Sequence, residues 1–174
     1  MQLLLPSRLI QRLQSELKRA GTREIGGLLM GEHVRDEVFR IVDISVQRSG
    51  GNRACFIRRP EDHKKALKRF FARTGNDFTR FNYLGEWHSH PTFMPSPSST
   101  DVATMQSLVT DPSVGVNFLI LLITKRDTSG NFQASATAFA AGSSPRHVAL
   151  EHEPSSPEDD GGLLRRLARR MLSV

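Results

Sequence analysis

The sequence is poor in cysteine and contains no long apolar stretch. Cys55 is the only cysteine among 174 residues, so an internal disulfide and a cysteine-rich metal site are both excluded. No apolar run approaches the roughly 20 residues that a membrane-spanning helix needs. The apolar start at residues 1–5 is too short for the core of a signal peptide, and Pro6 interrupts it. We therefore expect a cytoplasmic protein that makes no contact with a membrane.

The positive charge of the chain is concentrated in one segment. The formal net charge is +6, and residues 53–80 contain nine Lys or Arg against three Asp or Glu. Such a segment can attract nucleic acid or an acidic face of another protein. It can equally be the solvated outer face of a helix, and both interpretations stay open at this point. A nucleic-acid-binding module that uses residues 53–80 is therefore one alternative function.

Hydrophobic periodicity predicts a mixed α/β domain. Apolar stripes with helical spacing predict helices over residues 6–20, 60–73 and 99–109. Continuous or alternating apolar stretches predict strands over residues 26–34, 37–47, 82–88, 117–125 and 132–141. The order of these elements does not fix the topology of the sheet.

Composition changes at Gly142 and divides the chain into three parts. Residues 1–142 contain all the predicted strands and form the domain. Residues 143–162 are rich in Ser, Pro, Gly and acidic side chains, which is typical of a flexible linker. Residues 163–174 place leucines on one face and four arginines on the other, which predicts a basic amphipathic C-terminal helix. We expect this helix to dock onto its own domain rather than onto a partner subunit or a membrane surface.

Residues 85–101 combine side chains that can bind a metal. His88 and His90 are one residue apart on a predicted strand, so their side chains point to the same face. Asp101 falls in the first turn of the next predicted helix, close to the end of that strand. Two imidazoles and a carboxylate can hold one ion and leave a position for water, as a metal hydrolase requires. Taken singly, Asp101 is a carboxylate favoured at a helix start and Ser98 is an N-cap.

The spacing of the whole segment resembles that of a known family. The pattern His-x-His-Pro, six residues, Ser, two residues, Asp is met at every fixed position: His88, His90, Pro91, Ser98 and Asp101. It resembles the JAMM motif of the JAB1/MPN/Mov34 metallopeptidases, whose full pattern adds an upstream glutamate. Glu24 enters a Gly-containing apolar stretch in the expected context. The resemblance covers about residues 1–141 and implies an MPN (JAB) domain, a curved mixed β-sheet flanked by helices.

The resemblance also implies a role for each matching residue. His88, His90 and Asp101 would bind one Zn²⁺ per chain, with a catalytic water in the fourth position. Glu24 would be the catalytic base, and Ser98 would donate a hydrogen bond to the oxygen of the tetrahedral intermediate. Two neighbours lie on the opposite face of the strand: we expect core packing for Trp87 and assign no chemistry to Ser89.

The function implied is hydrolysis of the bond after the C-terminal glycine of ubiquitin or a ubiquitin-like protein. The segment 83–91 looks most like compact bacterial members, which occur beside E1- and E2-like enzymes in antiphage conjugation systems. The expected partners are a ubiquitin-like protein or its conjugate and those enzymes, without a membrane or nucleic acid. We expect the substrate tail to bind as an added strand beside the metal, with residues 48–53 and 92–97 as walls.

Three other classes of protein are disfavoured by residues that the chain has or lacks. A metal-free MPN scaffold usually lacks one or more ligands, whereas this chain has all of them. A zinc deaminase needs a Pro-Cys-x-x-Cys segment, which one cysteine cannot supply. The His-Glu-x-x-His motif of thermolysin-like proteases is absent.

Overall fold

The computed structural model describes residues 1–48 and 60–154. The predicted C-terminal helix over 163–174 lies outside these residues, as does most of the predicted wall over 48–53. None of the helices in the described ranges is long and apolar enough to cross a membrane. The elements in chain order are β1 (Gln2–Pro6), α1 (Ser7–Ala20), β2 (Gly26–Arg35), β3 (Val38–Ile44), α2 (Pro60–Arg73), β4 (Phe81–Ser89), α3 (Ser99–Thr110), β5 (Phe118–Arg126), β6 (Phe132–Ala140) and β7 (Arg146–Glu153).

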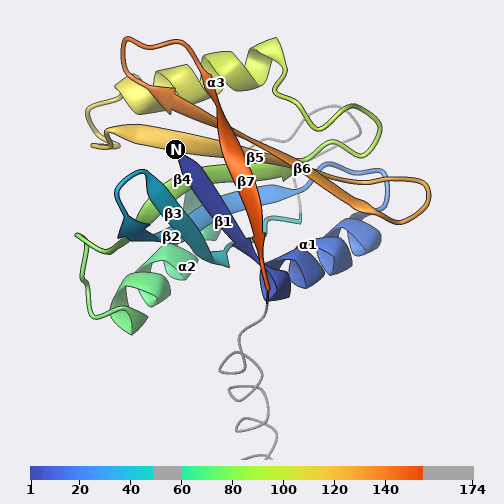
Figure 1. The fold of residues 1–174 in the computed structure, drawn as a ribbon, viewed down its shortest axis with the longest axis horizontal. Helices are drawn as coiled ribbons and strands as arrows, with labels where there is room; N and C mark the ends of the chain where they lie inside the picture. The colour runs from blue at the N-terminus through green and yellow to red at the C-terminus, as the bar shows by residue number, and fades with distance from the viewer. Residues whose placement is uncertain (49–59, 155–174) are drawn as a thin grey trace, which may run out of the picture.

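The strands form a closed mixed barrel in the order β1-β3-β2-β4-β5-β6-β7. β1 pairs in parallel with both β3 and β7, and β4 pairs in parallel with β5, while the other neighbours are antiparallel. Figure 1 shows β1 in dark blue beside β7 in orange, where the sheet closes. The expected mixed sheet and flanking helices are present. The closure of that sheet on itself is a feature that the sequence analysis did not predict.

Residues 146–153 correct the predicted linker over 143–162. They form β7, in which Val148 is buried in the core and Leu150 is partly buried, while His147, Ala149 and Glu151 are exposed. This alternation is that of a half-buried strand, but it is short and lies between Ser- and Pro-containing segments. The domain therefore continues beyond residue 142, at least to Glu153.

The other predicted elements lie close to their observed positions. α2 covers the predicted helix over 60–73, and α1 and α3 differ from their predicted ranges by one residue at one end. No strand was predicted over residues 2–6, which form β1. The predicted strand over 37–47 is too long, since β3 ends at Ile44.

Two apolar clusters hold the domain together. The larger one fills the barrel, and the smaller one lies between α3 and the outer face of β5 and β6. Successive residues of β5 alternate between them: Ile120 and Leu122 belong to the first, and Leu121 and Ile123 to the second. β5 is thus buried on both faces, which explains its continuous apolar sequence. In Figure 1, α3 lies at the top of the barrel and α1 and α2 at its lower end.

A charged cluster around Glu32 ties four parts of the barrel wall together. The Glu32 carboxylate lies 2.7 Å from the Arg40 guanidinium and 2.6 Å from that of Arg80, and Arg40 also contacts Glu153 at 2.8 Å. Burial raises the pKa of Glu32, but hydrogen bonds from Arg80 and Arg40 outweigh it and hold this pKa below its ordinary value. The cluster joins β2, β3 and β7 to the turn before β4.

Glu32→Gln should lower the free energy of unfolding at pH 7 by about 1–3 kcal/mol, because two guanidiniums lose a charged acceptor. The pKa of Glu32 is lowered on folding, so its stabilisation is complete above the unfolded value near 4.5 and is lost as the pH falls through the folded value. Urea unfolding from pH 3 to 7 measures this. The control is Asp36→Asn, at an exposed carboxylate of the β2–β3 turn. An equal loss at pH 3 and pH 7 would contradict the charge-based explanation.

Candidate active site

A β-bulge in β4 determines where the candidate ligands point. Leu29 pairs with Gly85 and Met30 with Tyr83, so Leu84 is an extra residue in the ladder. Gly85 has φ = 138°, and a Cβ there would lie 2.1 Å from the Ile120 carbonyl oxygen. Only glycine fits this close approach of β4 to β5.

The bulge changes which residues of β4 face the core. Leu84 and Trp87 both contribute to the barrel interior although they are three positions apart, a spacing that puts side chains on opposite faces of a regular strand. Trp87 is fully buried and its indole Nε1–H donates to the Ser45 carbonyl at 2.8 Å, which confirms the prediction of core packing. His88 and His90 therefore lie on the outer face, on the same side as α3.

Asp101 is held in position by the start of α3. Ser98 is the N-cap residue, and its Oγ accepts a hydrogen bond from the Asp101 backbone N–H at 3.2 Å. In return, Asp101 Oδ2 accepts from both the backbone N–H and the hydroxyl of Ser98, each at 2.7 Å. This capping box fixes the rotamer of Asp101 and directs its other oxygen toward β4.

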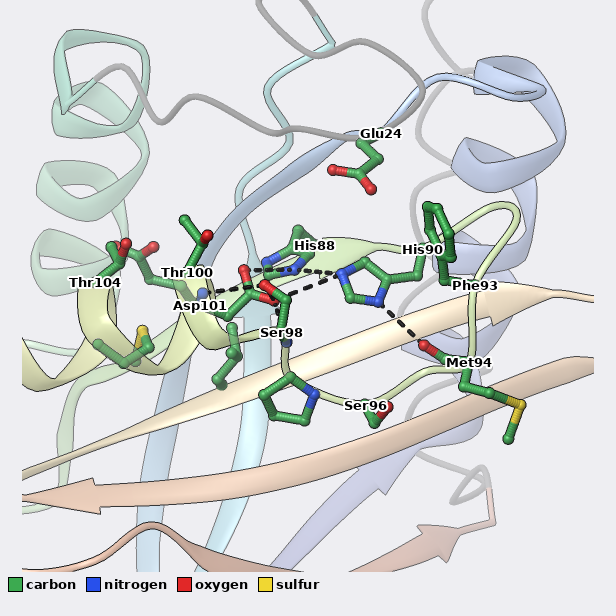
Figure 2. A pocket seen from close by; sticks show the side chains of 14 residues that line it. Glu24, His88, His90, Phe93, Met94, Ser96, Ser98, Thr100, Asp101 and Thr104 are labelled. Carbon is green, nitrogen blue, oxygen red and sulfur yellow. Dashed lines mark hydrogen bonds and ion pairs between the residues drawn. The ribbon is translucent and has the colours of Figure 1, made fainter.

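The two histidines and Asp101 come together as the sequence predicted. The Nε2 atoms of His88 and His90 are 3.0 Å apart, and they lie 3.3 Å and 3.7 Å from the oxygens of Asp101. Figure 2 shows the three side chains pointing toward one another. Bonds of about 2.0–2.1 Å in tetrahedral geometry put neighbouring ligand atoms roughly 3.3 Å apart. The observed separations therefore suit one tetrahedral ion.

The pKa shifts of His90 and Asp101 also suit a metal. His90 Nδ1–H donates to the Met94 carbonyl at 3.1 Å, which leaves its Nε2 lone pair directed toward the cluster. Burial lowers the pKa of His90, favouring the neutral imidazole that binds metals. Burial raises the pKa of Asp101, but hydrogen bonds with His88 and Ser98 outweigh it and hold this pKa well below its ordinary value.

Glu24 lies in the same pocket, just before β2. The residue is 5% exposed, and in Figure 2 its carboxylate points toward the two histidines. Burial raises the pKa of Glu24, while the charge of His88 opposes this rise. The carboxylate is thus placed beside the cluster without belonging to the set of three ligand atoms that lie within 4.8 Å of one another.

Ser89 has a positioning role that the sequence analysis missed. Its Oγ accepts from the Ile25 backbone N–H at 3.0 Å, and its own N–H donates to the Ile25 carbonyl at 2.9 Å. These bonds hold the peptide that follows Glu24 against the strand that carries the histidines. A serine between the two ligands, on the core face of a strand, was the available signal, because a buried hydroxyl needs a partner.

The pocket around the cluster has a volume of about 660 Å³. The predicted wall over 92–97 contributes to its lining with Phe93, Met94, Ser96 and Pro97. Phe93 and Met94 are 57% and 72% exposed, so the entrance next to the histidines is apolar. Of the other predicted wall, 48–53, only Arg48 is described, and it lines a different pocket. The pocket around the histidines is also lined by Glu86, Thr100 and Thr104, which were not singled out from the sequence.

The fold and the cluster together define a JAB-type domain. The family model described as prokaryotic homologs of the JAB domain matches residues 6–138, and the chain belongs to this family. The family assignment made from the sequence motif is thereby confirmed.

Three relatives carry the name "CD-NTase/cGAS isopeptidase". One, from Enterobacter hormaechei subsp. hoffmannii, is 27% identical over 146 residues, which are 82% of this chain and 78% of the relative. A second, from Escherichia coli, is 30% identical over 70% of this chain and 75% of the relative. A third, from Vibrio cholerae, is 35% identical over 61% of this chain and 65% of the relative.

The fold is also similar to the solution structure of protein DSY2949 from Desulfitobacterium hafniense. The TM-score is 0.68, and the match covers 90% of this chain and 96% of that one. Sequence identity is 16%, so this likeness supports the fold alone.

Ser89→Ala should lower the free energy of unfolding by about 1–3 kcal/mol, because the buried Ile25 N–H loses its partner. Chemical denaturation measures the loss. The control is Ser15→Ala on the exposed face of α1, which should change stability by less than about 0.5 kcal/mol. Equal effects of the two substitutions would show that the Ser89 hydroxyl does not hold the Glu24 segment.

Proposed function

We propose that the protein is a zinc-dependent isopeptidase that hydrolyses the bond after the C-terminal glycine of a ubiquitin-like protein. The observation that carries this proposal is the convergence of His88, His90 and Asp101 at separations of 3.0, 3.3 and 3.7 Å, with Glu24 in the same pocket. Three protein ligands leave a tetrahedral ion one position for water, which is the arrangement of a catalytic rather than a structural zinc site.

His88, His90 and Asp101 would hold one Zn²⁺ per chain through Nε2, Nε2 and a carboxylate oxygen. When bound, the ion would polarise the scissile carbonyl and lower the pKa of water toward about 7. The Met94 carbonyl supports the orientation of His90, and the Ser98 capping box supports that of Asp101. The protein thus contributes a ligand set whose geometry is determined by a strand end and a helix start.

Glu24 would act as the general base and then as the general acid. Its carboxylate would take a proton from the attacking water and deliver it to the departing amine of the lysine or peptide. Burial, which raises the pKa of Glu24, brings this carboxyl group nearer to the range in which it can both accept and release a proton. The hydrogen bonds between Ser89 and Ile25 would keep the carboxylate at its working distance.

Ser98 would donate a hydrogen bond to the oxygen of the tetrahedral intermediate. A hydroxyl has one proton, and the Ser98 proton is directed to Asp101 Oδ2 in this structure. The role therefore requires the hydroxyl to rotate toward the substrate. Its lone pairs can continue to accept from the Asp101 N–H, so the helix cap need not open.

The proposed substrate class rests on the names of the relatives and on the pocket. The relatives are named as isopeptidases of a CD-NTase or cGAS protein, so the conjugate cleaved here would carry such a nucleotidyltransferase or another target. E1- and E2-like enzymes of the same antiphage conjugation system would supply that conjugate in the cytoplasm. The exposed apolar side chains of Phe93 and Met94 would contact the residues of the substrate tail that precede its C-terminal glycine.

A catalytically inactive MPN scaffold is the alternative function. Scaffolds of this kind usually lose a ligand, whereas the ligand set and the base are all present here and share one pocket. This completeness favours the enzyme.

The purified chain should contain about one zinc ion per molecule. His88→Ala and Asp101→Asn should lose it; asparagine can still accept the Ser98 hydrogen bonds, so this variant should keep the start of α3. Glu24→Gln should retain the ion but lose at least about 100-fold in turnover of a ubiquitin-like conjugate. Elemental analysis and a cleavage assay measure the two effects, with Asp111→Asn at the exposed end of α3 as the control.

Two results would count against the proposal. A folded wild-type chain that stays free of zinc when zinc is supplied would identify a scaffold. A Glu24→Gln variant with wild-type turnover would remove Glu24 from the role of base, even if the metal site were intact.

A substrate tail that ends in Gly-Gly should be cleaved at least about tenfold faster than one with Leu at the penultimate position. The wall formed by 92–97 contains Pro95 and Pro97, and its Met94 carbonyl accepts a hydrogen bond from His90. This wall should therefore be stiff and leave only a narrow slot for the tail. Paired fluorogenic tails that differ at this one residue measure the ratio. Equal kcat/KM values for the two tails would show that no such slot exists.

A further inference from the structure

A second pocket lies between α1 and α2, away from the candidate active site. It has a volume of about 490 Å³ and shares no lining residue with the pocket of the histidines. Arg12 of α1 stands on one side, Arg69 and Arg73 of α2 on the other, and residues at the end of β3 form the floor. Figure 1 shows the two helices at the lower right and lower left of the barrel. We call this pocket the arginine pocket.

The charge of the arginine pocket is strongly unbalanced. Its lining includes four arginines, Arg12, Arg48, Arg69 and Arg73, and one acidic residue, Asp43; with Glu16, which pairs with Arg48 from outside the lining, the arginines still outnumber the acidic groups that face them. All its cations are arginines, although α2 also carries Lys65 and Lys68, which are exposed outside the lining. Guanidinium groups bind oxyanions through paired N–H donors, whereas a lysine offers a point charge.

Two of these arginines already converge on a single anion. Arg12 NH1 lies 2.7 Å from one oxygen of Asp43, and Arg73 NH2 lies 2.9 Å from the other. Guanidiniums from two different helices are thus within reach of one carboxylate. Each uses one nitrogen for Asp43, so both can offer further N–H donors to a second oxyanion between the helices.

The remaining two arginines differ in how they are held. Arg48 contacts the Glu16 carboxylate at 2.7 Å, so its guanidinium is fixed at the edge of the pocket. Arg69 forms no ion pair with any acidic side chain that the structure describes, a set that leaves out residues 49–62 and 155–174. The positive charge of Arg69 is therefore compensated by no side chain that the structure describes.

We propose that the arginine pocket binds a compact ligand that carries phosphate groups. A phosphate presents three oxygens and up to two charges, so guanidiniums on both helices can share it. The concave shape and the limited volume favour a di- or triphosphate group on a small molecule over an extended polyanion. Binding would neutralise the surplus charge and link α1 to α2.

Titration of the full chain with pyrophosphate tests this proposal. Isothermal calorimetry at fixed ionic strength should show saturable binding that Arg69→Gln and Arg12→Gln weaken at least tenfold. Lys68→Gln is the matched control: it removes one charge from the residue next to Arg69, outside the pocket, and should change affinity less than twofold. Pyrophosphate can also bind metal ions, but all three variants keep the candidate zinc ligands, so that contribution cancels in the comparison.

Arg69 is the decisive position, because its replacement removes no hydrogen bond or ion pair with another described side chain. Thermal unfolding of Arg69→Gln without ligand should therefore match the wild type, which separates lost binding from lost folding. Equal weakening by Arg69→Gln and Lys68→Gln, or no saturable binding by the wild type, would overturn the proposal. So would tight, steeply salt-dependent binding of a single-stranded oligonucleotide by a chain that does not bind pyrophosphate.

Discussion

One carboxylate links the secondary structure of this domain to its chemistry. Asp101 completes the capping box of α3 with one oxygen and faces His88 with the other. The first turn of α3 needs an acceptor for its N–H groups in any case, so the orientation of the candidate ligand follows from ordinary helix formation. A ligand on a free loop would need other contacts to fix its direction. Here the helix cap and the candidate metal ligand Asp101 are parts of the same hydrogen-bond network.

The candidate base is attached to the same framework by a different bond. Ile25 and Ser89 exchange two hydrogen bonds where β2 meets β4, and Glu24 precedes the first of these residues. His88 and His90 stand directly before and after Ser89 in the sequence. The base and the two histidines are therefore positioned by one strand pair of a closed barrel, which tolerates little relative movement. Among these residues, the proposed reaction then requires only that the Ser98 hydroxyl rotates.

Much of the site could be predicted from local sequence rules. The two-residue period of a strand places His88 and His90 on one face, and a Ser-x-x-Asp pattern before an apolar stripe marks a helix start. These rules do not say to which face of the sheet the histidines point. That depends on the bulge at Leu84 and Gly85, which becomes visible only when β4 is paired with its neighbours.

The closure of the barrel could not be predicted for a related reason. β1 and β7 pair across nearly the whole described chain, with Leu3 opposite Leu150. Each strand is short, and β7 shows only a brief alternation around Val148 within polar surroundings. No local pattern specifies such a long-range parallel pair. The positive charge of residues 53–80 was visible in the sequence, but its relation to Arg12 and Asp43 depends on how α1 and α2 pack beside β3.

The bulge in β4 also sets the length of the chain between Tyr83 and His88. If the same residues ran through a regular ladder without the bulge, the alternation of the strand would turn the two histidines into the barrel and Trp87 out of it. Deletion of the extra residue Leu84 would instead leave Tyr83 to His88 paired one-to-one with Met30 to Gly26, with both histidines still on the outer face. Among descendants of this sequence, the extra residue and the need for a glycine at position 85 can therefore be lost together, whereas replacing Gly85 in a strand of unchanged length puts the orientation of the ligand cluster at risk.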